Sequence, residues 1–345
     1  MIMKKFLPII LVLCLMLCSC GGGGTEETTT AAPEETTLAA EEITYRNPLN
    51  GEIIPEEYTG RVFATTINNV SPALPHIGVS QADLFFEMYI NDYCTRGLAL
   101  FTDVKSVPAI GSLRSCRQNF IDLAQGYNLI LCHTGGSDLV LSDLASSGID
   151  HMAIDVPVGY RDADRLAQGY SYEHTLLAKG ESLYNAAESK GYSLTAEGKN
   201  YGLSFADEVT LDGAAVNEIE IVFTIKNVKK TSTMTYDSAA DGYTYTQYGK
   251  TMTDGGETLR FKNVIVILAP TENVPHYDYV YHVADLVGTG DAYFFTGGKY
   301  APIKWSRAAE TEPFNFTMAD GSEVQLEAGS SYIAIAPTGS PVNMK

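Results

Sequence analysis

The chain has 345 residues, of which 45% are hydrophobic and 19% are charged, and its formal net charge at pH 7 is −19. A chain this acidic is repelled by nucleic acid and by an anionic bilayer, so neither is expected as a broad partner surface. The hydrophobic content is sufficient for a large core after the first 45 residues, as one domain or as two.

Residues 1–19 have the pattern of a lipoprotein signal peptide. Two lysines precede an almost continuous apolar run up to Leu17, and small residues lead to Cys20. The run is about a dozen residues long, whereas a bilayer crossing takes roughly 20, so a permanent transmembrane helix is the weaker interpretation. We therefore expect cleavage before Cys20 and diacylation of this cysteine, which would anchor the protein in the lipid bilayer on the extracytoplasmic face of the cell membrane. Cys18 is the rival site, but bulky Leu17 stands directly before it.

Residues 20–45 form the expected linker. They are rich in Gly, Thr, Ala and Glu and contain no basic residue, so they cannot bury enough apolar surface to offset the entropy of an ordered chain. A flexible chain of about 25 residues spans roughly 25 to 30 Å and would hold a folded domain away from the lipid headgroups. Removing the leader takes away two lysines and no acidic residue, so the net charge moves from −19 to −21.

The rest of the chain shows two kinds of sequence pattern, which predict an α/β domain over residues 46–205 and a β-rich domain over residues 206–345. In the first, strand-like runs alternate with helical spacing, and in the second, short strand patterns are separated by glycine turns. The clearest examples are Val62–Ile67, Leu98–Phe101, Phe120–Tyr127 and Leu183–Lys190 in the first domain, and Ile219–Ile225, Val264–Leu268, Tyr332–Ala336 and the Asp241-Gly242 turn in the second. The predicted fold class is mixed α/β.

Most of the candidate functional residues lie in the first predicted domain. Arg114 and Arg117 stand three residues apart just before a predicted helix, where two guanidinium groups could grip a carboxylate or a phosphate. Further on, a strand ends at His133, a Gly135-Gly136 loop follows, and Ser137 is the expected N-cap of the next helix. A glycine loop at a helix start favours anions, although such loops are more often only tight connections, and this one lacks the lysine of a phosphate loop.

Three cysteines follow the expected lipid anchor, namely Cys94, Cys116 and Cys132. An odd number without Cys-x-x-Cys spacing argues against a disulfide framework and against a zinc site. We therefore expect no metal, and no cofactor motif stands out. Cys132 lies in an apolar strand pattern, which favours a buried thiol that behaves as a small hydrophobic side chain.

A further set of residues runs through nearly the whole chain after the linker. It comprises Asn68-Asn69, Pro75, Gly78–Asp83, Glu87, Thr95-Arg96, Gly111, Arg114-Ser115, Arg117, His133, Gly135–Ser137, Gly288–Gly290, Gly297–Lys299, Trp305, Asp320-Gly321, Leu326 and Gly329. In order and spacing this set resembles the YerB-like lipoproteins, a family of unknown function. The resemblance implies a layered α/β sandwich with a β-rich C-terminal region. It also makes His174 and Trp305 secondary site candidates, and it places no cysteine at position 116.

Three hypotheses about function follow. The favoured one is an extracytoplasmic binding module for a small anionic ligand, a cell-wall glycan or an envelope protein. Its predicted cleft gathers Asn68, Asn69, Glu87, Arg96, Arg114, Arg117, His133, Gly135, Gly136 and Ser137. The alternatives are a structural or assembly protein in which these groups satisfy one another, and a hydrolase or transpeptidase acting on the cell wall.

The enzyme hypothesis requires either Cys116 with His133, as thiolate and base, or Asp83 with Glu87, as an acid and base pair. In the predicted strand the two carboxylates would lie about 13 Å apart, which is too far for such a pair. We therefore assign no catalytic residue.

The favoured hypothesis also predicts a dependence on pH. Arg114, Arg117 and His133 are expected to meet at one anion-accepting cleft, because a small anion dwells on so acidic a protein only where local positive groups overcome the overall field. Protonation of His133, with the ordinary histidine pKa of about 6.5, would then tighten anion binding as the pH falls from about 7.5 to 5.5.

Overall fold

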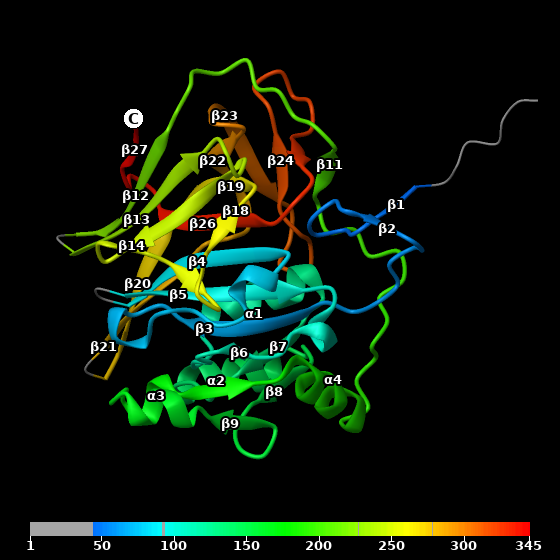
Figure 1. Cartoon of the computed structure of the whole chain (residues 1–345), viewed down its shortest axis with the longest axis vertical. Helices are drawn as coiled ribbons and strands as arrows, with labels where there is room; N and C mark the ends of the chain where they lie inside the picture. The colour runs from blue at the N-terminus through cyan, green and yellow to red at the C-terminus, as the bar shows by residue number, and fades with distance from the viewer. Residues whose placement is uncertain (1–43, 92–93, 227, 278) are drawn as a thin grey trace, which may run out of the picture. The chain divides into compact units, whose positions relative to one another are not determined.

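The computed structural model describes residues 44–91, 94–226, 228–277 and 279–345 (Figure 1). The leader, Cys20 and most of the linker lie outside the described residues. All described elements belong to one compact unit, Thr44–Lys345. Because this unit has its own core, we expect it to fold without the preceding segments. None of the helices described in it has both the length and the apolar character that a bilayer crossing requires.

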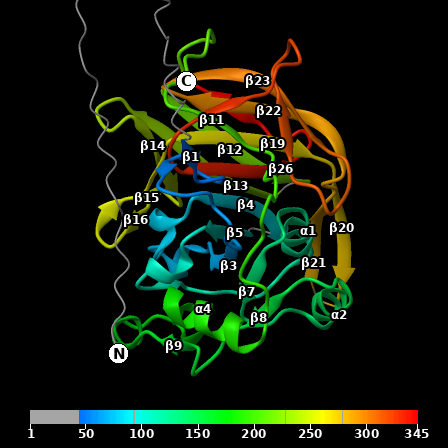
Figure 2. The ribbon, with the colours of Figure 1, turned by 90° about the vertical axis from the view of Figure 1, so that its right-hand side faces the viewer.

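A large mixed sheet forms the centre of the unit and takes strands from both halves of the chain (Figures 1 and 2). In hydrogen-bonded order its strands are β24 (Asn315–Thr317), β23 (Lys299–Arg307), β22 (Gly288–Thr296), β19 (Asn263–Ala269), β26 (Ser331–Pro337), β4 (Leu84–Asn91), β5 (Cys94–Phe101), β3 (Phe63–Asn68), β7 (Ile130–His133) and β8 (His151–Ala153). β26 pairs in parallel with β4, so the first half of the chain and the second half share one sheet. A hairpin of β20 (Thr271–His276) and β21 (Tyr279–Ala284) joins this sheet through β21 and β4.

The central strands β3, β4 and β5 are buried on both faces, as their long apolar runs lead one to expect. Side chains alternate between the two faces along a strand. Phe86 therefore belongs to a core on one face, whereas its neighbour Phe85 belongs to a second core on the other face. This alternation decides where each polar residue of these strands points.

Helices cover parts of both faces. They are α1 (Gln118–Tyr127), α2 (Asp138–Ser146), α3 (Ala163–Ala167) and α4 (Gly180–Ser189), with short 3-10 helices η1 (Ser71–Ala73), η2 (Val79–Gln81), η3 (Val104–Ser106) and η4 (Tyr172–His174). α1 and α2 pack on the Phe86 face, and α4 packs on the Phe85 face. Ser137 is the N-cap of α2, and its hydroxyl accepts a hydrogen bond from the Val140 N–H, as the sequence predicts.

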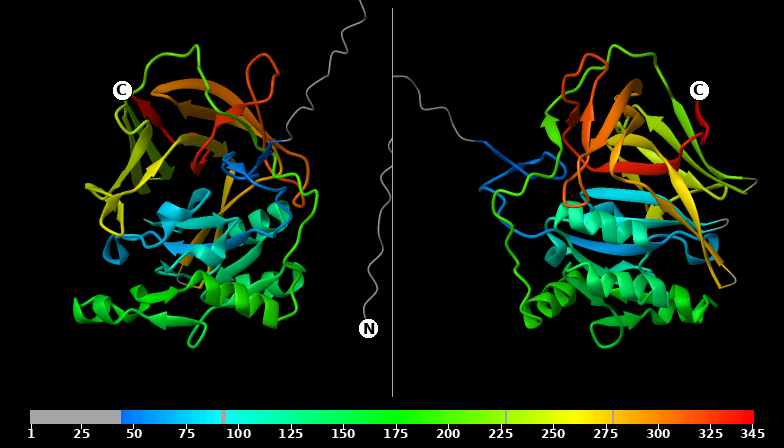
Figure 3. Two further views of the ribbon diagram at one scale, coloured as in Figure 1. Left: turned by 45° about the vertical axis from the view of Figure 1, so that its right-hand side comes forward. Right: turned by 180° about the vertical axis from the view of Figure 1, so that it is seen from behind.

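A second sheet lies against the Phe85 face (Figure 3). Its order is β15 (Lys250–Thr251), β14 (Gly242–Gln247), β13 (Val228–Asp237), β12 (Glu218–Ile225) and β27 (Val342–Met344), with β18 (Arg260–Phe261) paired to β14. Aromatic rings join the two sheets: Phe85 stacks on Phe261 with the ring centroids 6.0 Å apart, and Tyr89 stacks on Phe223 at 6.4 Å. The predicted layered α/β sandwich with a β-rich C-terminal region is confirmed.

Smaller pairings complete the unit. They are β1 (Tyr45–Arg46) with β2 (Ile53–Ile54), β10 (Leu176–Ala178) between β6 (Ile110–Gly111) and β9 (Gly159–Arg161), β11 (Ser204–Ala206) with β25 (Gln325–Glu327), and β16 (Thr253–Asp254) with β17 (Glu257–Thr258). Strand β10 anchors the segment that follows β6, because the Leu113 N–H donates to the Leu176 carbonyl at 2.9 Å. That segment carries Arg114 and Arg117.

Candidate functional site

Three arginines converge on a polar cavity on the Phe86 face of the large sheet. Arg96 of β5 pairs with Asn68 of β3, so their side chains share this face. Arg114 and Arg117 reach the same place from the segment between β6 and α1. The cavity has a volume of about 360 Å³ and is lined by Asn68, Val70, Asn91, Cys94, Arg96, Arg114, Arg117 and Tyr281. We call it the arginine pocket.

Arg96 is the most deeply buried of the three, with 5% of its surface exposed. Its Nη1 donates to the Ser115 carbonyl at 2.7 Å, and its Nε has no hydrogen-bond partner among the described residues. Burial, and then the cationic Arg117, lower the pKa of Arg96 to about 9. A pKa lowered in this way marks a cation that lacks a counter-charge, which an anion in the pocket would supply.

The other two arginines differ in their partners. Arg114 Nη2 donates to Glu173 Oε2 at 2.6 Å. Arg117 Nη1 donates to the Cys116 carbonyl at 2.7 Å, and its guanidinium lies 5.1 Å from the centre of the Tyr281 ring. The Nε atoms of both arginines are buried and, within the described residues, have no hydrogen-bond partner. Burial also lowers the pKa of Arg117.

His174 lies behind the pocket wall. Asn68 Nδ2 donates to His174 Nδ1 at 2.9 Å, while Asn68 Oδ1 is buried and has no partner in the described part of the chain. His174 is itself buried, and desolvation lowers its pKa. The secondary candidate His174 therefore orients Asn68 and does not line the pocket.

Glu87 and Asn69 point to the opposite face, into the interface between the two sheets. The Glu87 carboxylate is 0% exposed. Its two oxygens accept hydrogen bonds from Asn69, Thr95, Lys230, Ser232, Tyr245 and Tyr332, including the Asn69 Nδ2 at 3.0 Å and the Tyr245 hydroxyl at 2.7 Å. We call this group the Glu87 cluster.

Burial acts to raise the pKa of Glu87, but the Lys230 ammonium and the hydrogen bonds outweigh it, and the net pKa lies below the ordinary value. The carboxylate is therefore ionised, and its acceptor capacity is already occupied by protein groups. Such a satisfied network has the character of a structural clamp between β4 of the large sheet and β13 of the second sheet. The structure thus divides the predicted site residues between the arginine pocket and the Glu87 cluster.

His133 lies buried at the end of β7, outside the lining of the arginine pocket. Its Nδ1 hydrogen-bonds to the Gly135 carbonyl at 2.9 Å, and its Nε2 lies 3.2 Å from His151 Nδ1. Burial lowers the pKa of His133 to about 4. The imidazole is therefore neutral from pH 7.5 to 5.5, which corrects the expectation that its protonation would tighten anion binding in that range.

The loop at Gly135 and Gly136 is hydrogen-bonded to the segment that carries Arg114 and Arg117. The Gly135 carbonyl accepts from the Cys116 N–H at 2.8 Å, and the Thr134 N–H donates to the Arg114 carbonyl at 2.9 Å. Gly135 has a φ of +69°, which favours glycine. Gly135, Gly136 and Ser137 therefore shape the loop and the start of α2, and none of them lines the arginine pocket.

Two further candidates are structural. Trp305 is 1% exposed in the core, and its Nε1 donates to the Leu268 carbonyl at 3.1 Å. Asp83 does not pair with Glu87: its carboxylate accepts from Asn47 at 3.1 Å and from Asn50 at 2.6 Å. Its pKa is raised by burial.

Asn91, Cys94 and Tyr281 line the arginine pocket, yet the sequence did not single them out as site residues. Cys94 stands two residues before Arg96 on β5, so strand alternation from Arg96 would have found it. Tyr281 comes from β21 in the second half of the chain, and no local pattern connects it to the arginines.

Cys116 is a poor nucleophile in this setting, because burial raises the pKa of its thiol to about 12. We expect the native protein to leave Cys116 unmodified by a thiol-specific alkylating reagent at pH 8. Mass spectrometry of the alkylated protein provides the measurement, with denatured protein as the control. Rapid modification of native Cys116 would contradict this account.

Comparison with known proteins places the chain among proteins of unknown function. Models of the N-terminal domain and of the C-terminal domain of a protein family of unknown function (DUF3048) match residues 49–193 and residues 219–333. A relative from Bacillus subtilis (strain 168), YerB, which is named as a candidate lipoprotein, is 27% identical over 304 residues and is covered over 84% of this chain and 86% of its own. The crystal structure of the YerB protein from Bacillus subtilis matches with a TM-score of 0.74 and 24% identity, over 87% of this chain and 99% of that chain.

Proposed function

The chain belongs to the DUF3048 family, and we propose that it is a lipoprotein that binds a small anion in its arginine pocket on the outer side of the cell membrane. The leader before Cys20 supports the lipid anchor, as does the similarity to the candidate lipoprotein YerB over 84% of this chain. The anion site rests on the structure of the pocket.

The single observation that carries the proposal is the state of the three guanidinium groups. Their Nε atoms are all buried without a partner among the described residues, and a buried donor left without a partner costs about 1 to 3 kcal/mol. Neither Arg96 nor Arg117 forms an ion pair with a carboxylate in the described part of the chain, whereas Arg114 pairs with Glu173. An anion in the pocket would remove the uncompensated charge of these guanidinium groups.

The cavity also limits the kind of anion. Its volume of about 360 Å³ is roughly that of twelve water molecules in the liquid, enough for a phosphate, a sulfate or a carboxylate with a substituent. Asn68 Oδ1 and Asn91 Oδ1 are buried acceptors without a partner among the described residues. A ligand with a hydroxyl group, or a singly protonated phosphate, would donate to them once these side chains turn toward it.

We expect the segment 44–345 to bind inorganic phosphate, and Arg96→Met and Arg114→Ala each to weaken that binding by about 1.5 to 3 kcal/mol, the usual worth of a charge-assisted hydrogen bond. Isothermal titration calorimetry at low salt is the measurement. Arg260→Ala is the matched control, because Arg260 is an exposed arginine on β18, outside the pocket. Equal binding by all four proteins, or none by the parent segment, would end the proposal.

Glu173→Gln supplies a test in the opposite direction. The half-exposed Glu173 carboxylate forms an ion pair with Arg114 and so competes with an anionic ligand for it. An exposed ion pair of this kind contributes about 0.2 to 1 kcal/mol. Removing its charge should therefore tighten phosphate binding by up to about fivefold. A loss of affinity in this variant would show that Glu173 helps to hold the ligand.

A further inference from the structure

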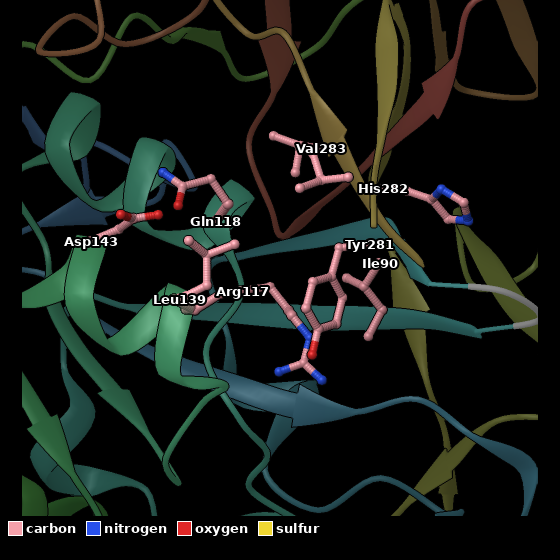
Figure 4. Close-up of a pocket in the computed structure, with 10 residues that line it drawn as sticks. Ile90, Arg117, Gln118, Leu139, Asp143, Tyr281, His282 and Val283 are labelled. Carbon is pink, nitrogen blue, oxygen red and sulfur yellow. The ribbon is translucent and has the colours of Figure 1, made fainter. Parts of the chain in front are cut away.

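A second cavity adjoins the arginine pocket. It has a volume of about 160 Å³ and lies among β4, α2 and the β20–β21 hairpin (Figure 4). Apolar side chains make most of its wall, namely Ile90, Leu139, Val140, Val274, Tyr281 and Val283. Leu139 is 40% exposed. We call it the apolar cavity.

The two cavities share the side chains of Arg117 and Tyr281 as walls, so they lie side by side there. Figure 4 shows the Arg117 side chain beside the Tyr281 ring, with Gln118 and Asp143 on the opposite side of the apolar cavity. The positive groups therefore lie at one end and a carboxylate at the other. A ligand that extends through both cavities has its negative charge at the arginine end, because Asp143 would repel it at the far end.

From this arrangement we infer that the ligand is an amphiphilic anion, whose charged group lies in the arginine pocket and whose short apolar arm fills the apolar cavity. The inference rests on the proposed function and names the class of its ligand. A cavity of about 150 Å³ lined by aliphatic side chains accepts a benzene ring, so the arm is about one aromatic ring or an alkyl chain of similar size. A long membrane acyl chain does not fit, and the ligand is therefore a water-soluble molecule.

The test compares inorganic, ethyl, butyl, hexyl and phenyl phosphate on the segment 44–345 by calorimetry. Each methylene removed from water should tighten binding by about fourfold until the cavity is full. Leu139→Gln should lose most of the gain for butyl and phenyl phosphate and keep the affinity for inorganic phosphate. Leu141→Gln is the matched control, since Leu141 is 39% exposed on the same helix and does not line the cavity.

The outcomes separate the inference from the proposed function. If inorganic phosphate binds with the expected dependence on Arg96, but a longer alkyl group on the phosphate does not raise the affinity, the apolar arm is refuted and the anion site stands. If no phosphate binds, both fail. A further experiment sediments the segment with lipid vesicles. If it sediments with phosphatidylglycerol but not with phosphatidylcholine vesicles, and Leu139→Gln abolishes this, then the ligand is a membrane lipid. That result would overturn the inference of a water-soluble ligand with a short apolar arm.

Discussion

Replacing Lys230 by methionine should lower the free energy of unfolding of the segment 44–345 by about 3 to 5 kcal/mol, because it leaves the Glu87 carboxylate charged, buried and without its cation. Lys230 is 4% exposed and its ammonium contacts Glu87 directly. Methionine is unbranched like lysine and one atom shorter, so the replacement removes the ammonium group with its charge and its donors. Urea denaturation, followed by circular dichroism, is the measurement.

The pH dependence of this variant gives a second readout. In the parent protein the pKa of Glu87 is lowered, so its stabilising contribution is present above the unfolded pKa of about 4.3 and is lost as the pH falls through the lower folded value. Without Lys230, burial dominates and raises the folded pKa above the unfolded one. Stability then falls as the pH rises between these two values, and the defect should be smaller at pH 5 than at pH 8.

The adjacent Lys229→Met serves as the matched control for this experiment. Lys229 is exposed on the same strand, so its replacement should change the free energy of unfolding by less than about 0.5 kcal/mol. If Lys230→Met were as mild as Lys229→Met at both pH values, the Glu87 cluster would not be the clamp described above.

The second large effect concerns Cys20. We expect Cys20→Ala to abolish membrane retention or to block processing, because a diacylated cysteine supplies the two chains that stable anchoring requires. Cell fractionation with an antibody to the folded unit is the measurement. Cys18→Ala is the control and should leave the protein in the membrane fraction. Unchanged retention of the Cys20→Ala protein, or its loss in Cys18→Ala alone, would contradict the assignment of the anchor.

Much of the fold could be predicted because its elements are strongly patterned. The run Val62–Ile67 appears as β3 and the spacing from Phe120 to Tyr127 as part of α1. The long hairpin β20–β21 was not predicted. β20 contains polar residues and a proline. In the described residues the hairpin pairs with the large sheet only through β21. The apolar periodicity of its sequence is therefore weak.

The site was predicted only in part, for a physical reason that two neighbouring pairs show. Asn68 and Asn69 are adjacent, as are Thr95 and Arg96, yet in each pair one residue lies at the arginine pocket and the other at the Glu87 cluster. Sequence proximity suggested one cleft, but successive side chains of a strand point to opposite faces. The alternation was visible in the sequence, whereas the presence of a second sheet over one face was not.

Because β26 pairs with β4, the large sheet can be completed only after nearly the whole chain has been synthesised. β26 ends at Pro337, close to the C-terminus, and it fills the place between β19 and β4. During synthesis, β4 and β5 emerge long before β26 does, so the edge of β4 that β26 later covers remains an open apolar edge until then. Exposed edges of this kind recruit other strands. A chain cut short before residue 331 would therefore have an incomplete sheet, which makes it a substrate for proteases and chaperones.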